Sequence, residues 1–167
     1  MLFNSLTFLW FFLIVYGLYV VLNHRWQNRM LIVAGLVFYG WWDWRFLSLL
    51  IASVFLDFFC GLKIHDAGTL TRRRLWLAVS MTGNLGMLGF FKYYNFFADS
   101  FAELLTALGF QAHPSTLRFI LPVGISFYTF QSMSYTLDIY RRQMTPTHSL
   151  TNFAVFVSFF PQLLAGP

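Results

Sequence analysis

Charged residues are scarce in this 167-residue chain: only 10% are Asp, Glu, Lys or Arg, against about 25% in an average soluble domain. Hydrophobic residues make up 58%, and the 22 Phe, 6 Trp and 8 Tyr are too many to hide in a water-soluble core of this size. These proportions exclude a soluble globular domain and a disordered or collagenous chain. We therefore expect an integral membrane protein.

Cysteine is nearly absent, because Cys60 is the only one, so no intrachain disulfide can form. Acidic residues are also few, and six Asp and Glu against eleven Lys and Arg give a formal net charge of +5. Basic residues scattered between apolar runs are explained by membrane topology rather than by nucleic-acid binding. No nucleic-acid partner is expected.

Long apolar runs predict an all-α, polytopic membrane fold with five or six membrane segments in a single domain, residues 1–167. Three Trp residues beside a charge pair at 41–45 indicate an interfacial belt. Residues 96–110 carry Asp99 and Glu103, and we expect this stretch to lie in the interface or to tilt steeply. The apolar runs are 6–22, 30–42, 46–60, 75–91, 119–137 and 153–167, and Pro161 is expected to break the last one.

The distribution of Lys and Arg predicts how the chain is oriented. A short basic turn is expected at 24–29 and a longer polar loop at 63–74. If the first four runs cross the membrane, the six basic residues of these two segments share one face, and Arg45 and Lys92 fall on the other. This asymmetry places the basic segments in the cytoplasm and the N-terminus outside it.

The run that ends near residue 137 carries a stripe of polar residues and glycine at steps of three and four, which places them on one face of a helix. The stripe consists of Gly124, Tyr128, Gln131, Tyr135, Asp138 and Arg142. Because a polar face is costly in lipid, it is expected to face protein or a water-filled cavity. Two interpretations stay open. The stripe forms hydrogen bonds between helices, or Tyr128, Gln131, Tyr135 and Asp138 line a substrate path.

Two further polar features are candidate sites. Asp57 lies inside an apolar run and is a candidate intramembrane site, with structural pairing or solvation near the cytoplasmic end of its run as the alternative. The cluster Arg72, Arg73 and Arg74 is typical of a topology signal that contacts anionic lipid, and contact with the phosphates of a cytosolic cofactor is the alternative. No metal site is expected, because the four His residues and the single Cys are widely spaced.

Four stretches carry a resemblance to a known family. They are FYGWWDWRFLSLL at 38–50, GFFKYYNFF at 89–97, ILPVGISFYTFQSMSYTLDIYRR at 120–142 and FVSFFPQLLAGP at 156–167. In this order they resemble the membrane-bound O-acyltransferase family, and within it the alginate O-acetyltransferase branch.

The resemblance implies a polytopic enzyme of the bacterial inner membrane. Such an enzyme transfers acetyl groups from cytosolic acetyl-CoA, its donor substrate, to hydroxyls of an exported polysaccharide, with the help of periplasmic partner proteins. The catalytic His of the family follows the FFPQLLAGP motif at 159–167, so no catalytic residue is assigned in this chain. We expect the N-terminal portion of an acyltransferase, inactive by itself and without a resident cofactor. A non-catalytic truncated membrane protein and a transporter-like protein are the alternatives.

Overall fold

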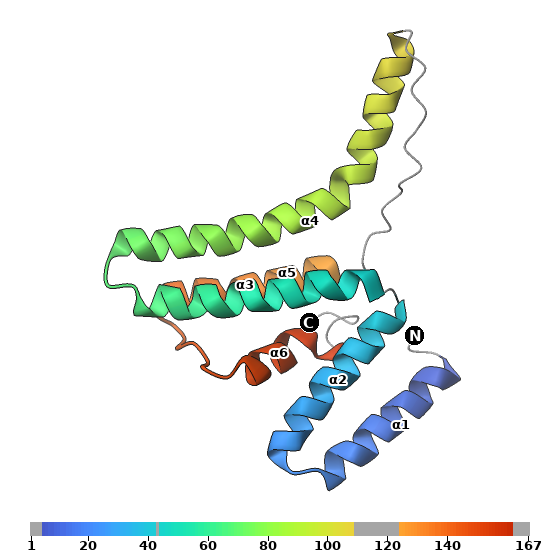
Figure 1. The fold of residues 1–167 in the computed structure, drawn as a ribbon, viewed down its shortest axis with the longest axis vertical. Coiled ribbons are helices and arrows are strands. Elements are labelled where there is room, and N and C mark those ends of the chain that lie inside the picture. Colours follow the sequence, from blue (N-terminus) through green and yellow to red (C-terminus); the bar gives the residue numbers. More distant parts are fainter. Residues whose placement is uncertain (1–4, 43, 109–123, 162–167) are drawn as a thin grey trace.

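The computed structural model describes residues 5–42, 44–108 and 124–161, and all regular secondary structure in these ranges is helical (Figure 1). The all-α class predicted from the sequence is confirmed for this part of the chain. The elements are α1 (Leu6–Val21), α2 (His24–Trp42), the 3-10 turn η1 (Trp44–Phe46), α3 (Leu47–Asp66), α4 (Leu70–Ala107), α5 (Ile125–Tyr140) and α6 (Leu150–Ser158).

Three helices form the centre of the molecule. α3, α5 and the first part of α4 run side by side, and α6 packs across α3 and α2 (Figure 1). Their buried apolar side chains form one core, which includes Leu50, Phe58, Ile125 and Phe153. α1 packs on α2 outside this core, where Val15 and Phe38 belong to a second, smaller cluster.

The outer surface of the described chain is apolar. On α1, Leu6, Trp10 and Val21 are 76%, 65% and 83% exposed. A soluble monomer rarely exposes a continuous apolar surface of this kind, whereas lipid covers it without cost. Among the described residues, one helical stretch is long and apolar enough to cross a membrane, Trp44–Asp66. α1 is equally apolar but has only 16 residues. A membrane location fits these observations, and the count of five or six segments is not confirmed.

The start of α2 corrects one sequence-based expectation. The predicted basic turn at 24–29 is wrong, because these residues form the first turns of α2. The backbone N–H groups of Trp26 and Gln27 donate to the carbonyl oxygen of Asn23 at 2.8 and 2.9 Å and begin the helix there. The connection after α1 is therefore only two residues long. The basic side chains are tolerated in the helix because they lie at its exposed end.

The predicted polar loop at 63–74 is also much shorter in the structure. α3 continues to Asp66 and α4 begins at Leu70, so only three residues connect them. The Thr69 side chain caps α4 by accepting a hydrogen bond from the Arg72 backbone N–H at 3.4 Å. Two consequences follow. The three arginines lie in the first two turns of α4, and Asp57 lies about halfway along α3 rather than near its end.

α4 joins two segments that the sequence separates. The runs at 75–91 and 96–110 were expected to be distinct, yet a single helix of 38 residues extends to Ala107. No Gly or Pro interrupts 90–107, so nothing in that stretch ends the helix. At about 1.5 Å per residue α4 is about 57 Å long, nearly twice the hydrocarbon thickness of a bilayer. It bends near its middle and its second part leaves the bundle (Figure 1), so α4 does not lie wholly within the bilayer core.

The last apolar run is broken as predicted. α6 ends at Ser158, and Phe159 adopts an extended conformation with φ −63° and ψ 107°. Phe160 and Pro161 are helical again, and Pro161 has no N–H group that could donate to the carbonyl of Val157, which explains the break between these two residues. The remainder of this run, 162–167, lies outside the described residues, as do residues 119–123 at the start of the run 119–137.

Candidate functional site

The most polar site inside the described chain lies where α3, α4 and α5 meet. Each helix contributes two polar residues four positions apart, which places them on one face of the helix. The six side chains, called here the buried polar cluster, are Ser53 and Asp57 on α3, Ser80 and Asn84 on α4, and Ser132 and Thr136 on α5. All six are at most 1% exposed.

Asp57 is the centre of this cluster. Its Oδ1 accepts a hydrogen bond from the Ser80 hydroxyl at 2.5 Å, and its Oδ2 accepts one from the Ser132 hydroxyl. The Asn84 amide donates to both carboxylate oxygens, at 2.9 and 2.8 Å. Within the described ranges Asp57 forms no ion pair with a Lys, Arg or His. Hydrogen bonds from neutral groups on two neighbouring helices therefore replace the water that this acid loses on burial.

Further hydrogen bonds connect the donors with one another. The Ser53 hydroxyl donates to the Asn84 carbonyl oxygen Oδ1 at 2.7 Å, and the hydroxyls of Ser80 and Thr136 are 3.0 Å apart. Each of the three helices is thus linked to both others. In the buried polar cluster the polar groups satisfy one another, which is the arrangement expected of a network that fixes how helices pack. Asp57 is fully buried. The sequence-based alternative, in which water solvates Asp57 near a helix end, is therefore wrong.

The predicted common helical face is wrong for two of the six stripe residues, because Gly124 precedes α5 and Arg142 follows it, both with a positive φ. Of the four that lie on α5, Gln131 and Tyr135 contact α6 and the segment before it. The Gln131 amide nitrogen donates to the carbonyl oxygen of Phe156 on α6 at 2.8 Å. The Tyr135 hydroxyl accepts from the backbone N–H of Thr147 at 3.1 Å, and its ring lies 4.5 Å from the Phe153 ring. These contacts fit the interpretation of hydrogen bonding between helices.

Tyr128, also in the stripe, faces Tyr39 on α2. The two rings pack edge to face with centroids 6.2 Å apart. The hydroxyl groups of Tyr39 and Tyr128 are buried and interact with each other, whereas Oε1 of Gln131 is buried and has no hydrogen-bond partner among the described residues. Asp138 is only half-buried and joins none of these contacts. The stripe therefore contains both satisfied and unsatisfied polar atoms, and unsatisfied buried atoms are typical of a place that a ligand or water occupies.

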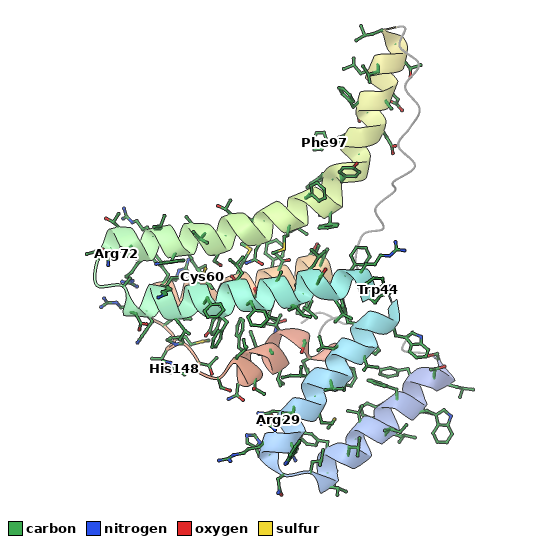
Figure 2. All side chains as sticks on the ribbon, in the orientation of Figure 1. Arg29, Trp44, Cys60, Arg72, Phe97 and His148 are labelled. Atoms are coloured by element: carbon green, nitrogen blue, oxygen red, sulfur yellow. The ribbon has the colours of Figure 1, made fainter. Side chains whose placement is uncertain are left out.

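The three arginines differ in their surroundings. Arg72 and Arg74 are exposed. Arg73 is half-buried, donates to the carbonyl oxygen of Tyr140 at the end of α5, and lies over the Tyr140 ring with its guanidinium carbon 5.2 Å from the centroid. Figure 2 shows Arg72 and His148 at the same end of the bundle, and Trp44 at the opposite end. One end is therefore basic and the other carries an exposed Trp.

The described residues neither gather metal-ligating side chains nor bury a His. They contain no group of three His, Cys, Asp or Glu side chains that could hold a metal ion. His24, His65 and His148 are exposed, and His113 lies outside the described residues. No catalytic residue is assigned.

Sequence reasoning singled out Asp57 but missed the five other members of the buried polar cluster. Serine, threonine and asparagine are common in membrane helices, so none of the five draws attention alone. The available signal was their spacing, since each of the three apolar helices carries a polar pair at positions i and i+4. Such a pair marks the face that each helix turns towards the others.

Comparison with known proteins identifies relatives along the whole chain. A Pseudomonas aeruginosa protein named "Probable alginate O-acetylase AlgI" is 44% identical over 169 aligned positions, which cover 100% of this chain and 32% of the relative. An Azotobacter vinelandii protein of the same name is 41% identical, with 34% of it covered. A Helicobacter pylori peptidoglycan O-acetyltransferase is 36% identical over 197 positions, with 36% of it covered.

No protein-family model and no solved structure matches the chain. The chain spans about a third of the length of the curated relatives that it matches. All its residues align with these relatives, and the hydrophobic helices of the described part suit a membrane protein. Along its full length the chain is therefore related to the alginate O-acetylases, which confirms its resemblance to the membrane-bound O-acyltransferase family.

Proposed function

We propose that this chain is the N-terminal portion of a membrane-bound O-acetyltransferase, which transfers acetyl groups from cytosolic acetyl-CoA to hydroxyls of an exported, alginate-like polysaccharide. The observation that carries the proposal is the 44% identity to a named alginate O-acetylase over all of this chain. The apolar outer surface and the membrane-length helix Trp44–Asp66 support placing this chemistry in a membrane.

The catalytic base in this proposal is a His outside residues 1–167. A general base must come within hydrogen-bond reach of the hydroxyl that it deprotonates. The described His residues are exposed rather than gathered with other polar groups in a closed site, which supports a base elsewhere. Residues 1–167 then supply helices that frame the site, with the buried polar cluster holding three of them in register.

The polar stripe lines the path of the acceptor in this proposal, with Tyr128, Gln131 and Tyr135 inside and Asp138 at its half-buried end. The support comes from the unpartnered Gln131 Oε1, because a hydroxyl of a sugar would satisfy such an atom. Asp57 has a positioning role, since neutral groups of the protein already hold both its oxygens.

The orientation in this proposal follows the basic residues. The end that carries the three arginines faces the cytosol of a bacterium, and the N-terminus lies outside the cytosol. Arg72 and Arg74, both exposed, meet anionic headgroups of the inner membrane. The opposite end, where Trp44 is exposed, faces the periplasm and the proposed acetylation partners.

Transfer of radiolabelled acetyl groups tests the proposal. Membranes with the full-length gene product should move label from acetyl-CoA to an added alginate acceptor, and membranes with residues 1–167 alone should not. Absence of transfer by the full-length protein would favour the transporter-like alternative. Transfer by residues 1–167 alone would contradict the placement of the base outside this chain. A parallel reaction with peptidoglycan tests the second acceptor, which the name of the Helicobacter pylori relative suggests.

A further inference from the structure

The basic end of the bundle contains a cavity of about 350 Å³, here called the basic pocket. Three elements that are distant in the sequence supply its polar lining. His65 lies at the end of α3, Arg73 in the first turn of α4, and Arg142 and Thr145 in the segment after α5. Two arginines and a histidine therefore converge on one small cavity.

The inner side of the basic pocket is apolar and consists of buried core residues. Ile64 and Ile139 line this side. They are 0% and 2% exposed, and both belong to the central core. Arg73 is held in place by its hydrogen bond to the Tyr140 carbonyl and by its position over the Tyr140 ring. A guanidinium has five N–H donors, so one such bond leaves Arg73 with further donors for a ligand.

Arg142 reaches the basic pocket through an unusual turn. Its φ is 60°, in the left-handed region that residues other than glycine seldom adopt. Two hydrogen bonds close the turn: the Arg142 N–H donates to the Ile139 carbonyl at 3.0 Å, and the Gln143 N–H donates to the Asp138 carbonyl at 2.9 Å. Residues in such conformations are concentrated at ligand clamps and other functional sites.

No described carboxylate compensates the positive charge of the basic pocket. Within the described ranges, neither Arg73 nor Arg142 has a carboxylate oxygen within 4.0 Å of its nitrogens. Asp66 and Asp138, the acids nearest along the lining elements, form no such pair. Two guanidinium groups that line one cavity repel each other, and an anion between them turns this repulsion into attraction.

We propose that the basic pocket is a phosphate-binding subsite in which Arg73 and Arg142 hold a phosphate or diphosphate group from two sides. Arginine suits this role because its planar fork matches two phosphate oxygens at once. The cavity is at the lower end of the range of about 300–1,000 Å³ for ligand sites, so it has room for a phosphate or diphosphate group. The group belongs either to a soluble phosphate compound or to a lipid headgroup.

Binding of inorganic pyrophosphate to the full-length protein in phosphatidylcholine nanodiscs tests the subsite by calorimetry. Arg142→Gln and Arg73→Gln should each weaken binding by about tenfold or more, because each removes charge-assisted hydrogen bonds. The matched control is Arg25→Gln, which removes the same charge from an exposed position on α2 and should change binding by less than about twofold. Arg142 is exposed and outside the helices, so its variant keeps the fold intact even if Arg73→Gln does not.

A second measurement distinguishes the two sources of phosphate. The experiment is repeated in nanodiscs that contain phosphatidylglycerol, and native mass spectrometry counts the lipids that the protein retains. If phosphatidylglycerol weakens the binding of pyrophosphate, and the Arg142→Gln variant retains fewer phosphatidylglycerol molecules than the parent protein, the subsite binds a lipid headgroup. If pyrophosphate binds equally well with and without phosphatidylglycerol, the subsite binds the phosphate group of a soluble compound. Equal binding by the parent protein and Arg142→Gln, or no binding of either ligand, would overturn the proposal. Because no turnover is measured, the result is independent of the proposed acetyl transfer.

Discussion

Asp57 illustrates how a single residue acquires its role from its neighbours. An acid in an apolar helix is expensive unless other groups replace its water. Ser80, Asn84 and Ser132 do so from two other helices, and no described cation takes part. The carboxylate therefore works as a shared acceptor that joins α3, α4 and α5.

Removal of this acceptor should destabilise the protein. Asp57→Ala leaves the donors of Ser80, Asn84 and Ser132 without a partner, so we expect the free energy of unfolding to fall by at least about 2 kcal/mol. Asp57→Asn retains an acceptor oxygen and the shape of the side chain, and should cost less than half as much. Unfolding of the full-length protein in mixed detergent micelles, followed by Trp fluorescence, measures both.

The control for Asp57 is Asp66→Ala, which removes an exposed acid from the last turn of the same helix and should change stability by no more than about 0.5 kcal/mol. Equal losses for Asp57→Ala and Asp66→Ala would show that the buried polar cluster does not stabilise the bundle. Acetyl transfer by Asp57→Asn gives a separate answer: unchanged transfer at unchanged expression excludes a role of Asp57 in proton transfer.

At the scale of elements, α2 and α6 approach each other closely at one glycine. A Cβ atom built on Gly35 would collide with the backbone carbonyl of Ser158, a group that cannot move aside as the end of a side chain can. Phe159, where α6 breaks, is the next residue in the chain after Ser158. The close approach therefore depends on a missing side chain in α2 and on the place where α6 ends.

Gly35→Ala should destabilise the protein by about 1–3 kcal/mol, because the added methyl group forces the two backbones apart. Gly86→Ala is the matched control. A Cβ at Gly86 meets no atom within 4 Å, so the better helix propensity of alanine should leave stability unchanged or raise it by up to about 1 kcal/mol. Thermal unfolding of both variants in the same detergent compares them, and a stable Gly35→Ala protein would contradict the contact.

At the scale of the whole molecule, α3 separates a basic end from an end with exposed Trp. Its 20 residues span about 30 Å, which equals the hydrocarbon thickness of a bilayer. Arg72 and His148 lie at one end and Trp44 at the other (Figure 2). This is the arrangement that positive-inside sorting and interfacial Trp residues favour.

Thiol labelling from one side of the membrane tests this orientation. An impermeant maleimide added to spheroplasts should modify Trp44→Cys, whereas Arg72→Cys and His148→Cys should react only after the membrane is opened. The native Cys60 is 2% exposed and should stay unlabelled, which makes the parent protein the control. The reverse pattern would invert the orientation, and labelling of all three positions from one side would show that α3 does not cross.

Composition and periodicity alone determined the helical class, the apolar character of the surface and the break near Pro161, because these depend on local hydrophobicity and on the missing N–H of proline. The same reasoning failed at 24–29 and 63–74, where charged residues were assigned to loops. Helices cover 24–29 and all of 63–74 except residues 67–69, because exposed charged side chains at a helix end need no loop to reach water.

The contacts of the polar residues follow from the packing of the helices. Hydrogen bonds around Asp57 join residues from three helices, and no pattern within one helix states which of its neighbours provides the donors. The basic pocket likewise depends on a left-handed turn at Arg142 that brings this side chain to the same cavity as Arg73. Local sequence sets which residues can lie in a helix, and the packing of helices far apart in the chain sets which of them meet.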